Sequence, residues 1–273
     1  MTTRYEQIRF CRQLNHPLKR RRDTDDANAY SQRRLAIVVE EVSRRLADVR
    51  VPGMTANLVP LLEVTGAFVQ GCLDAGRGVL AMSRAKEHGG IVAAERSAWE
   101  MWNELDYLLR RPDPPMEAVK VQVNAILEIT SWMKEQEHVS SDVLNRNEEG
   151  LSRFQRDYPE IVRAVSEQRK KGRFHWSGKS RSKIVGPTAK AADVYKLLSW
   201  ETHPDILSIR DVEATFVQRD GVLTLNSPQN SLVITLTERS ASSTSECLLR
   251  AWNAFAQFWM LEVLELVPPR KPQ

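Results

Sequence analysis

Apolar residues recur at spacings of three and four along most of this chain, the pattern of amphipathic α-helices. Pro and Gly residues interrupt the repeats and favour breaks between helices. The repeats are clearest between the Pro52-Gly53 pair and the proline cluster at 112–115, where two long helices are predicted. The whole pattern predicts helices over residues 27–49, 55–88, 91–110, 115–137, 141–171, 189–202 and 245–267.

Three of these predictions have open alternatives. Pro159 lies inside the fifth helix, where it is able to kink the helix. Residues 231–244 are either a strand or the front of the last helix. The glycines of the second helix either permit close contact with another helix or mark a break near residue 77: Gly66, Gly71, Gly76 and Gly78.

A small β-hairpin is predicted near residues 214–226, where Asp220-Gly221 separates two β-prone runs. A two-stranded ribbon is marginal alone, so it has to pack on helices. Five to seven helices with short joints containing Pro or Gly predict an all-α fold, an antiparallel helical bundle with this hairpin as an appendage. We expect a polar basic arm over residues 1–24 and a single domain over 25–273.

The basic charge of the chain is local. No Asp or Glu occurs between Gln168 and Ala192, whereas eight Lys or Arg do. The other 31 basic residues are outnumbered by 35 acidic ones, so this run turns a mildly acidic chain into one of net charge +4. A field of one sign attracts phosphate-bearing or acidic partners. The predicted anion-binding or nucleic-acid-binding residues in and beside this run are Lys170, Lys171, Arg173, Trp176, Lys179 and Arg181.

A polar stripe follows one side of the third predicted helix. Arg96, Glu100, Asn103 and Tyr107 lie at spacings of four, three and four, nearly opposite the apolar face. The first interpretation is a solvated face with an ordinary Arg96–Glu100 ion pair. The alternative is a polar cleft covered by another element, which would contact Trp99 at the edge of the stripe.

Ser199 and His203 share one side of the short helix that follows the basic run, and Pro204 is expected to end that helix. His203 either caps the helix end or acts as a general acid or base on a bound phosphate or ribose. No spacing of His, Cys or carboxylates suggests a metal site or a conventional catalytic triad, so we expect neither a metal nor a cofactor.

Three motifs in this order resemble an uncharacterised bacterial all-helical family of unknown function. They are ERSAWE at 95–100, HWSGKS at 175–180 and YKLLSWETHP at 195–204. The resemblance covers roughly residues 55–210 and depends on the set of motifs, since each is weak alone. That family looks distantly related to the HEPN helical bundles, which include many RNases of toxin, defence and RNA-processing systems.

The resemblance implies a metal-independent RNase, with one departure from the HEPN pattern. Those RNases carry an Arg four to six residues before a His near a helix end. Here Ser199 stands four residues before His203, Leu197 stands six before, and no Arg lies between. If an arginine partner exists, Arg96 from another helix is the candidate. HEPN relatives often form dimers with composite sites, so a homodimer is a further expectation.

Three hypotheses follow. The safest is a non-catalytic helical binding or assembly module that uses the basic segment against RNA or an acidic protein surface. The second is an RNase in which the catalytic candidates are His203, Arg96, Glu100 and Ser199, with bases stacking on aromatic residues of the basic segment. The third is a small-molecule site in a polar pocket of the bundle. Whether the protein is an enzyme stays open.

Composition favours a cytoplasmic location. The three cysteines are far apart in sequence and odd in number, which suggests a reducing compartment. The N-terminal residues lack the apolar run of a signal peptide. No segment approaches about 18 uncharged apolar residues, so we expect no membrane span and no membrane partner.

Overall fold

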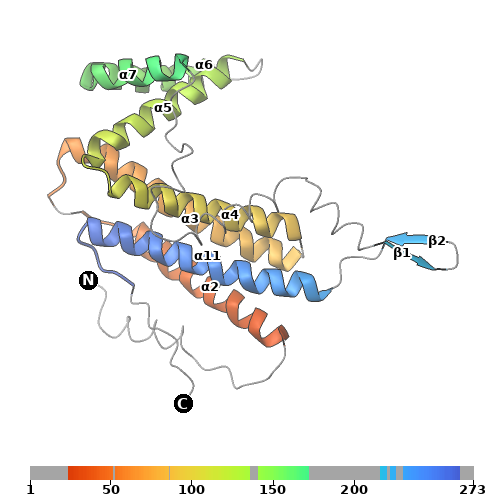
Figure 1. Ribbon diagram of the computed structural model, residues 1–273. Coiled ribbons are helices and arrows are strands. Elements are labelled where there is room, and N and C mark those ends of the chain that lie inside the picture. Colours follow the sequence, from red (N-terminus) through yellow and green to blue (C-terminus); the bar gives the residue numbers. More distant parts are fainter. Residues whose placement is uncertain are drawn as a thin grey trace. The chain divides into compact units, whose positions relative to one another are not determined.

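The computed structural model describes residues 24–51, 53–85, 87–135, 141–171, 216–219, 222–225 and 230–264. These residues are predominantly helical (Figure 1), which confirms the predicted all-α class. The predicted helix over 189–202 and residues 1–23 of the predicted arm lie outside the described residues. The helices are α2 (Thr24–Ala47), the 3-10 helix η1 (Ala56–Leu58), α3 (Val59–Ala85), α4 (His88–Leu109), α5 (Pro114–Lys134), α6 (Ser141–Asp157), α7 (Pro159–Lys170) and α11 (Asn230–Phe258).

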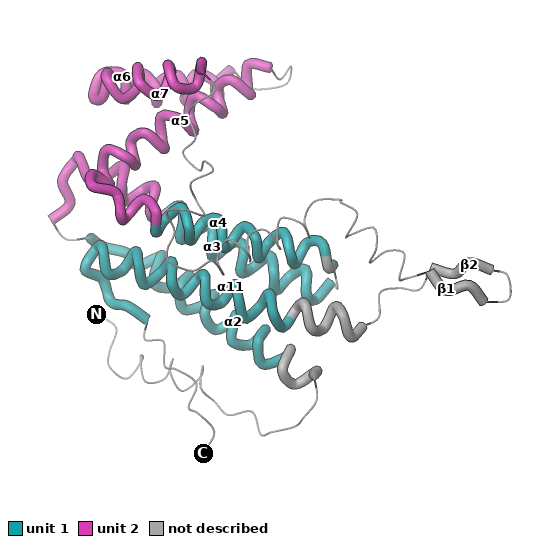
Figure 2. The backbone as a smooth tube through the Cα atoms, viewed as in Figure 1, with its two compact units in different colours: residues 1–51, 67–106, 185–273 teal, residues 52–66, 107–184 magenta. Residues whose placement is uncertain are grey.

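The described helices divide into two compact units (Figure 2). Unit 1 contains α2, α11 and most of α3 and α4. Unit 2 contains η1, the first turns of α3, the last residues of α4, and α5 to α7. The single domain expected over residues 25–273 stays a prediction.

Four helices of unit 1 bury a common apolar core. Helix α3 runs antiparallel to α4, because Gly71 approaches Met101 while Gly78 approaches Ala94. The periodic apolar residues of each helix point inward, which is why the spacing of three and four predicted these helices. Core side chains that are at most 2% exposed include Leu35, Val38, Val42, Val69, Leu73, Val79, Ile91, Leu105, Leu248 and Phe255.

Two glycines of α3, Gly71 and Gly76, serve close packing. A Cβ atom added at Gly76 would lie 2.9 Å from Cγ2 of Val39 on α2, and one added at Gly71 would lie 2.8 Å from Cγ of Met101 on α4. Helix α3 continues without interruption from Val59 to Ala85, so the alternative of a break near residue 77 is wrong.

We expect Gly76→Ala to lower the free energy of unfolding by about 1–2 kcal/mol. Overpacking against the rotationally stiff Val39 costs about 1–3 kcal/mol, which outweighs a gain of about 1 kcal/mol in helix propensity. Gly66→Ala is the matched control on the same helix and should add up to about 1 kcal/mol, since nothing lies within 4 Å of its Cβ position. Urea denaturation measures both. Equal stabilisation by the two substitutions would contradict the close packing at Gly76.

The predicted helix over 141–171 is wrong as one element, because it consists of two helices. Tyr158 leaves the helical conformation with φ −140° and ψ 55°, and Pro159 is in the first turn of α7. A proline in a helix interior removes one hydrogen bond and clashes with the carbonyl four residues before it. At the first turn neither cost applies, so Pro159 starts a new helix.

Helices α5, α6 and α7 of unit 2 pack around a core of their own. Helix α6 is antiparallel to α5, because Gly150 approaches Ile126 while Lys134 and Glu148 form an ion pair at 2.9 Å. The buried members of this core are Val119, Val123, Val162 and Val165.

The observed bounds of α11 show the structure of residues 231–244 and differ from the predicted end of the last helix. Residues 231–244 are helical and form the front of α11. The helix ends at Phe258 and not at Val267 as predicted. Met260 takes φ +54°, a left-handed conformation that reverses the chain, and the Leu261 N–H donates to the Ala256 carbonyl at 2.7 Å.

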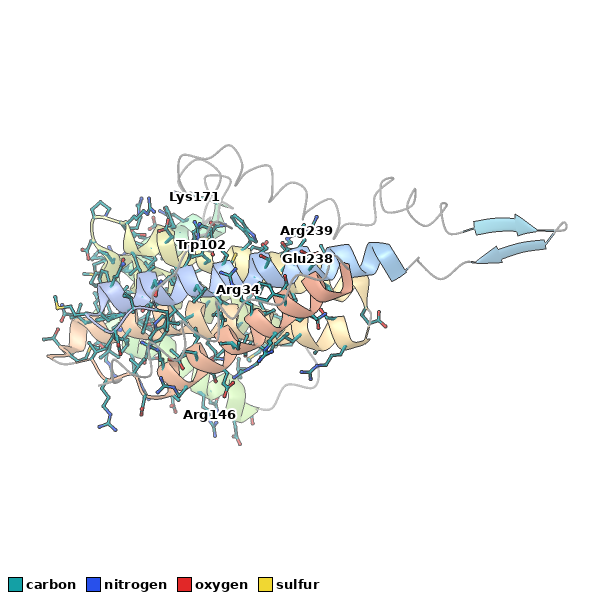
Figure 3. The ribbon with its side chains drawn as sticks, turned by 90° about the horizontal axis from the view of Figure 1, so that it is seen from below. Arg34, Trp102, Arg146, Lys171, Glu238 and Arg239 are labelled. Atoms are coloured by element: carbon teal, nitrogen blue, oxygen red, sulfur yellow. The ribbon has the colours of Figure 1, made fainter. Side chains whose placement is uncertain are left out.

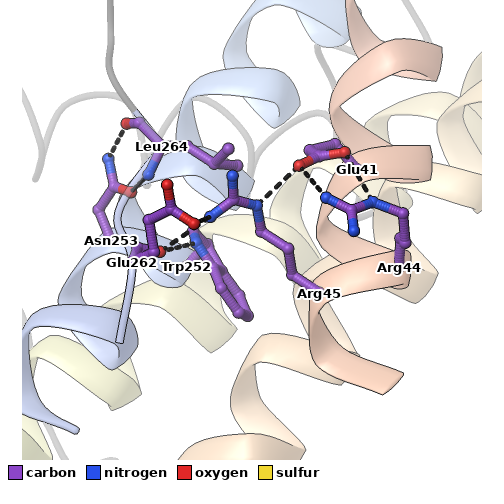
Figure 4. A network of polar contacts seen from close by, with 7 residues as sticks. All are labelled: Glu41, Arg44, Arg45, Trp252, Asn253, Glu262 and Leu264. Carbon is purple, nitrogen blue, oxygen red and sulfur yellow. Dashed lines mark hydrogen bonds and ion pairs between the residues drawn. The ribbon is translucent and has the colours of Figure 1, made fainter. Parts of the chain in front are cut away.

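After this reversal the chain is held against α2 and α11 by a network of polar contacts (Figure 4). Arg45 donates from Nε to Glu41 at 2.7 Å and from Nη1 to the Glu262 carbonyl at 3.0 Å. The Trp252 indole N–H donates to the same carbonyl at 3.3 Å. The side chain of Asn253 both donates to and accepts from the backbone of residue 264, at 2.8 and 2.7 Å.

Glu41 makes this network sensitive to acid. Burial alone would raise the pKa of its carboxyl group, but hydrogen bonds and charges from Arg44 and Arg45 outweigh burial and lower the pKa below the ordinary 4.5. The ionised carboxylate therefore stabilises the fold above the ordinary pKa, and this contribution disappears as pH falls through the lowered value. Thermal unfolding between about pH 5 and 3 should show a smaller loss of stability for Glu41→Gln than for the wild type. An equal acid dependence would contradict this role.

Strands β1 (Phe216–Arg219) and β2 (Val222–Leu225) pair antiparallel, with Phe216 opposite Leu225 and Arg219 opposite Val222. The connecting residues 220 and 221 lie outside the described residues. The hairpin as an appendage packed on the bundle stays a prediction.

One described stretch, Ala56–Ala85, is long and apolar enough to cross a membrane by length and composition. The expectation concerned uncharged apolar residues, and this stretch contains Glu63, Asp74, Arg77 and Arg84, so the lack of a membrane span stays a prediction. Core helices of soluble proteins pass the same test, and 39% of the most apolar window is buried within this protein. The expected lack of a membrane partner stays a prediction.

Candidate functional site

Helix α4 brings together two of the predicted catalytic residues. Arg96 Nε lies 3.0 Å from Glu100 Oε1, and the two side chains are 23% and 26% exposed. Both residues make further interactions beyond this pair. The interpretation of their stripe as a solvated face is wrong, because Arg96 and Glu100 are half-buried and Asn103 is only 9% exposed. Both α3 and α11 pack against α4. Together they bury a wider part of the α4 surface than its stripe of apolar residues predicts.

Helix α11 is the element that covers the edge of this stripe. The Trp99 indole N–H donates to Ser243 Oγ at 3.0 Å, and Trp99 packs edge-to-face on Trp102 with ring centroids 5.3 Å apart. The guanidinium of Arg250 lies 5.3 Å from the centroid of the Trp102 ring, a cation–π contact. Trp99 therefore contacts α11, whereas a polar cleft lined by the stripe stays a prediction.

The contact between α4 and α11, which we call the polar seam, contains a buried acid that the sequence analysis missed. Glu95 is 2% exposed and accepts a hydrogen bond from Ser240 Oγ at 2.6 Å. The guanidinium of Arg239, labelled in Figure 3, lies 3.7 Å from the same carboxylate. A buried carboxylate needs such a donor and counter-charge, because burial without them is costly. Since Glu95 pairs with residue 240 and Trp99 with residue 243, α4 and α11 run parallel, so the predicted antiparallel arrangement is wrong for this pair of helices.

Helix α7 carries the described part of the basic segment. Lys170 and Lys171 are exposed at the end of this helix, and Lys171 is labelled in Figure 3. Arg169 differs from them, because its Nη1 donates to Asn124 on α5 at 2.6 Å and lies 3.7 Å from Glu128. Arg169 thus fixes the end of α7 to α5 and offsets a carboxylate, whereas the two lysines extend into solvent.

The other predicted site residues lie outside the described residues: Arg173, Trp176, Lys179, Arg181, Ser199 and His203. The Arg96–Glu100 pair belongs to unit 1, whereas Lys170 and Lys171 belong to unit 2. Convergence of all these residues into one pocket therefore stays a prediction.

Comparisons with family models, with curated proteins and with solved structures find no match. The resemblance to HEPN bundles accordingly remains a hypothesis that rests on the motifs in the sequence.

Two cysteines lie in the core of unit 1 and are not suited to nucleophilic chemistry. Cys72 and Cys247 are free thiols at 0% and 2% exposure. Burial raises the pKa of both, so neither forms the reactive thiolate at neutral pH. Within the described parts of the chain, no three His, Cys, Asp or Glu side chains are grouped so that they could hold a metal ion.

Proposed function

We propose that this protein is a helical binding or assembly module whose basic segment, which begins at the end of α7, engages nucleic acid or another anionic partner. The observation that supports this most is the exposure of Lys170 and Lys171 at the start of a run without Asp or Glu. Such a run concentrates positive charge in one segment of the chain, which favours phosphate or carboxylate partners. A cytoplasmic location, a homodimer and a hairpin appendage are parts of the same proposal.

The base of this segment is rigid, which favours a binding role over a solvated tail. Val165 is 1% exposed in the core of unit 2, and Arg169 is bonded across to Asn124. The backbone N–H of Lys171 still donates to the Glu167 carbonyl at 3.2 Å. The lysines are therefore presented from a fixed helix end, which lowers the entropy lost on binding.

The test is charge reversal. Lys170→Glu combined with Lys171→Glu and Arg173→Glu should weaken binding of a labelled RNA oligonucleotide at least tenfold at low salt, measured by fluorescence anisotropy. The slope of log affinity against log salt should fall, by about 0.7 for each phosphate of a single strand that is no longer neutralised. The matched control reverses three exposed arginines of α6 with the same change in net charge: Arg146, Arg153 and Arg156. Equal weakening by both triple variants would contradict a localised binding segment.

An HEPN-like RNase is the second candidate, and the Arg96–Glu100 ion pair is the observation that favours it. In this hypothesis His203 transfers protons, Arg96 stabilises the developing negative charge and Glu100 orients Arg96. Cleavage of RNA in the presence of EDTA, lost in His203→Ala, is the expected result. RNA that stays intact with both proteins would end the catalytic hypothesis and leave the binding module.

A further inference from the structure

The last turn of α7 is held to unit 2 differently from the rest of that helix. Tyr158, Val162 and Val165 lie at spacings of four and three and pack in the core of unit 2. No apolar residue follows Val165 in α7, which continues as Ser-Glu-Gln-Arg-Lys. The next position of the same stripe, four residues after Val165, is Arg169. An arginine therefore stands where the pattern of the helix would otherwise place an apolar side chain.

The contacts of Arg169 take over from the apolar side chains at this end of the helix. Its Nη1 donates to Oδ1 of Asn124 on α5 at 2.6 Å and lies 3.7 Å from Oε2 of Glu128, one turn further along α5. Helices α5 and α7 belong to the same compact unit (Figure 2). Helix ends fray where tertiary contacts do not hold them, so the contact of Arg169 with Asn124, which we call the α7 anchor, stabilises the last turn.

Arg169 differs from the two lysines that follow it in what it offers to a partner. Its side chain is 30% exposed, its Nη1 is hydrogen-bonded to Asn124, and the carboxylate of Glu128 offsets its charge. Lys170 and Lys171 are exposed to solvent. The first residue of the basic run thus belongs to the fold of unit 2, and the next two present their charges outward.

We infer that Arg169 and Asn124 are positioning residues, whose contact fixes the last turn of α7 and so presents Lys170 and Lys171 to an anionic partner that Arg169 itself does not contact. A frayed helix end has to be ordered again on binding, which lowers affinity. This inference rests on the proposed function and adds to it that an uncharged residue of another helix contributes to binding.

Asn124→Ala tests the inference in the full chain, with the labelled RNA oligonucleotide as the probe. The substitution removes the acceptor of Arg169 and leaves the net charge unchanged. Binding should weaken roughly 5- to 30-fold, which corresponds to ordering one backbone residue again. The slope of log affinity against log salt should stay the same, because the lysines still neutralise the same phosphates. The matched control is Asn145→Ala, at an exposed asparagine of α6, which should leave the affinity unchanged.

Hydrogen exchange measures the α7 anchor without any ligand. The Lys171 N–H donates to the Glu167 carbonyl at 3.2 Å, so its protection reports on the last turn. In Asn124→Ala the amides of residues 168–171 should exchange at least about threefold faster, whereas the amide of Val165 in the core should stay protected. Asn124→Asp keeps an oxygen acceptor and should restore the wild-type rates. Unchanged exchange at residues 168–171 in Asn124→Ala would overturn the inference, whatever the RNA binding.

Arg169→Met combined with Glu128→Gln distinguishes positioning from direct contact. The pair removes both charges at once, so the net charge is again unchanged. Binding should weaken as in Asn124→Ala and with the same salt slope, and adding Asn124→Ala should weaken it no further, because both changes break one contact. A salt slope lower by about 0.7, with losses that add, would show that Arg169 neutralises a phosphate itself and would refute the positioning role.

Failure of the inference is distinguishable from failure of the proposed function. Faster exchange in Asn124→Ala with unchanged RNA binding refutes the positioning role and leaves the proposed function intact. If the wild type binds labelled polyglutamate and not RNA, the same variants measured with polyglutamate decide the positioning role. Binding of neither probe refutes the proposed function, and the role of the α7 anchor in binding with it.

Discussion

Glu95→Ala is expected to lower the free energy of unfolding by about 2–4 kcal/mol, measured by urea denaturation. The substitution removes a side chain that is 2% exposed and leaves the Ser240 hydroxyl buried without its acceptor. Unpaired buried polar groups cost about 1–3 kcal/mol, and the cavity adds to this. Glu100→Ala is the matched control one turn further along α4. Its side chain is 26% exposed, so the expected cost is below about 1 kcal/mol.

A double-mutant cycle separates the pair from its surroundings. Ser240→Ala alone leaves the Glu95 carboxylate short of a donor and should cost about 1–3 kcal/mol. Glu95→Leu combined with Ser240→Ala removes both polar partners, and this double variant should be close to the wild type in stability. Costs of Glu95→Leu and Ser240→Ala that simply add in this double variant would contradict a direct coupling between α4 and α11.

The double variant also tests what the seam is for. A buried, hydrogen-bonded carboxylate contributes little net stability compared with a well-packed apolar pair, which suggests a second role for Glu95. One such role is to fix the register of α4 on α11, and with it the position of Arg96. If the stable double variant cleaves or binds RNA as the wild type does, the polar seam has no role in function.

The helices were predictable because each buries one side against a neighbour, which imposes the spacing of three and four on its apolar residues. Boundaries were less predictable. Pro159 was recognised as a possible kink, but the kink is a complete break, since Tyr158 leaves the helical region. The end of α11 was placed too late because Met260 adopts a left-handed conformation that is normal for glycine and not signalled by methionine.

The buried acid of α4 had a signal that the sequence analysis did not use. Glu95 falls in phase with the apolar positions Ile91, Ala98 and Leu105, so its side chain points into the core. Ser240 is likewise in phase with core positions of α11, Cys247 among them. A polar residue in phase with a core stripe predicts a buried polar contact, but its partner depends on which helices meet.

Arg45→Ala is expected to cost about 2–4 kcal/mol in the free energy of unfolding. Its side chain is 6% exposed and joins Glu41 on α2 to the carbonyl of Glu262 beyond the end of α11. Removal leaves a buried void and breaks a partly buried ion pair, both of which are costly. Arg45→Met keeps most of the packing volume, so the difference between the two variants isolates the volume from the charge. The measurement is urea denaturation, in which all variants share one slope of unfolding free energy against urea concentration.

Arg44→Ala provides the comparison that decides why Arg45 matters. Arg44 is the preceding residue and also bonds Glu41, at 2.8 Å, but its side chain is 46% exposed. Exposed ion pairs contribute about 0–1 kcal/mol, so Arg44→Ala should have little effect. The two arginines are indistinguishable by residue type and by their shared partner Glu41, and they differ in burial and in the contact with Glu262. Equal costs for the two substitutions would mean that the attachment of the chain beyond α11 to α2 adds nothing to stability, and that the Glu41 ion pairs alone hold this end of the bundle.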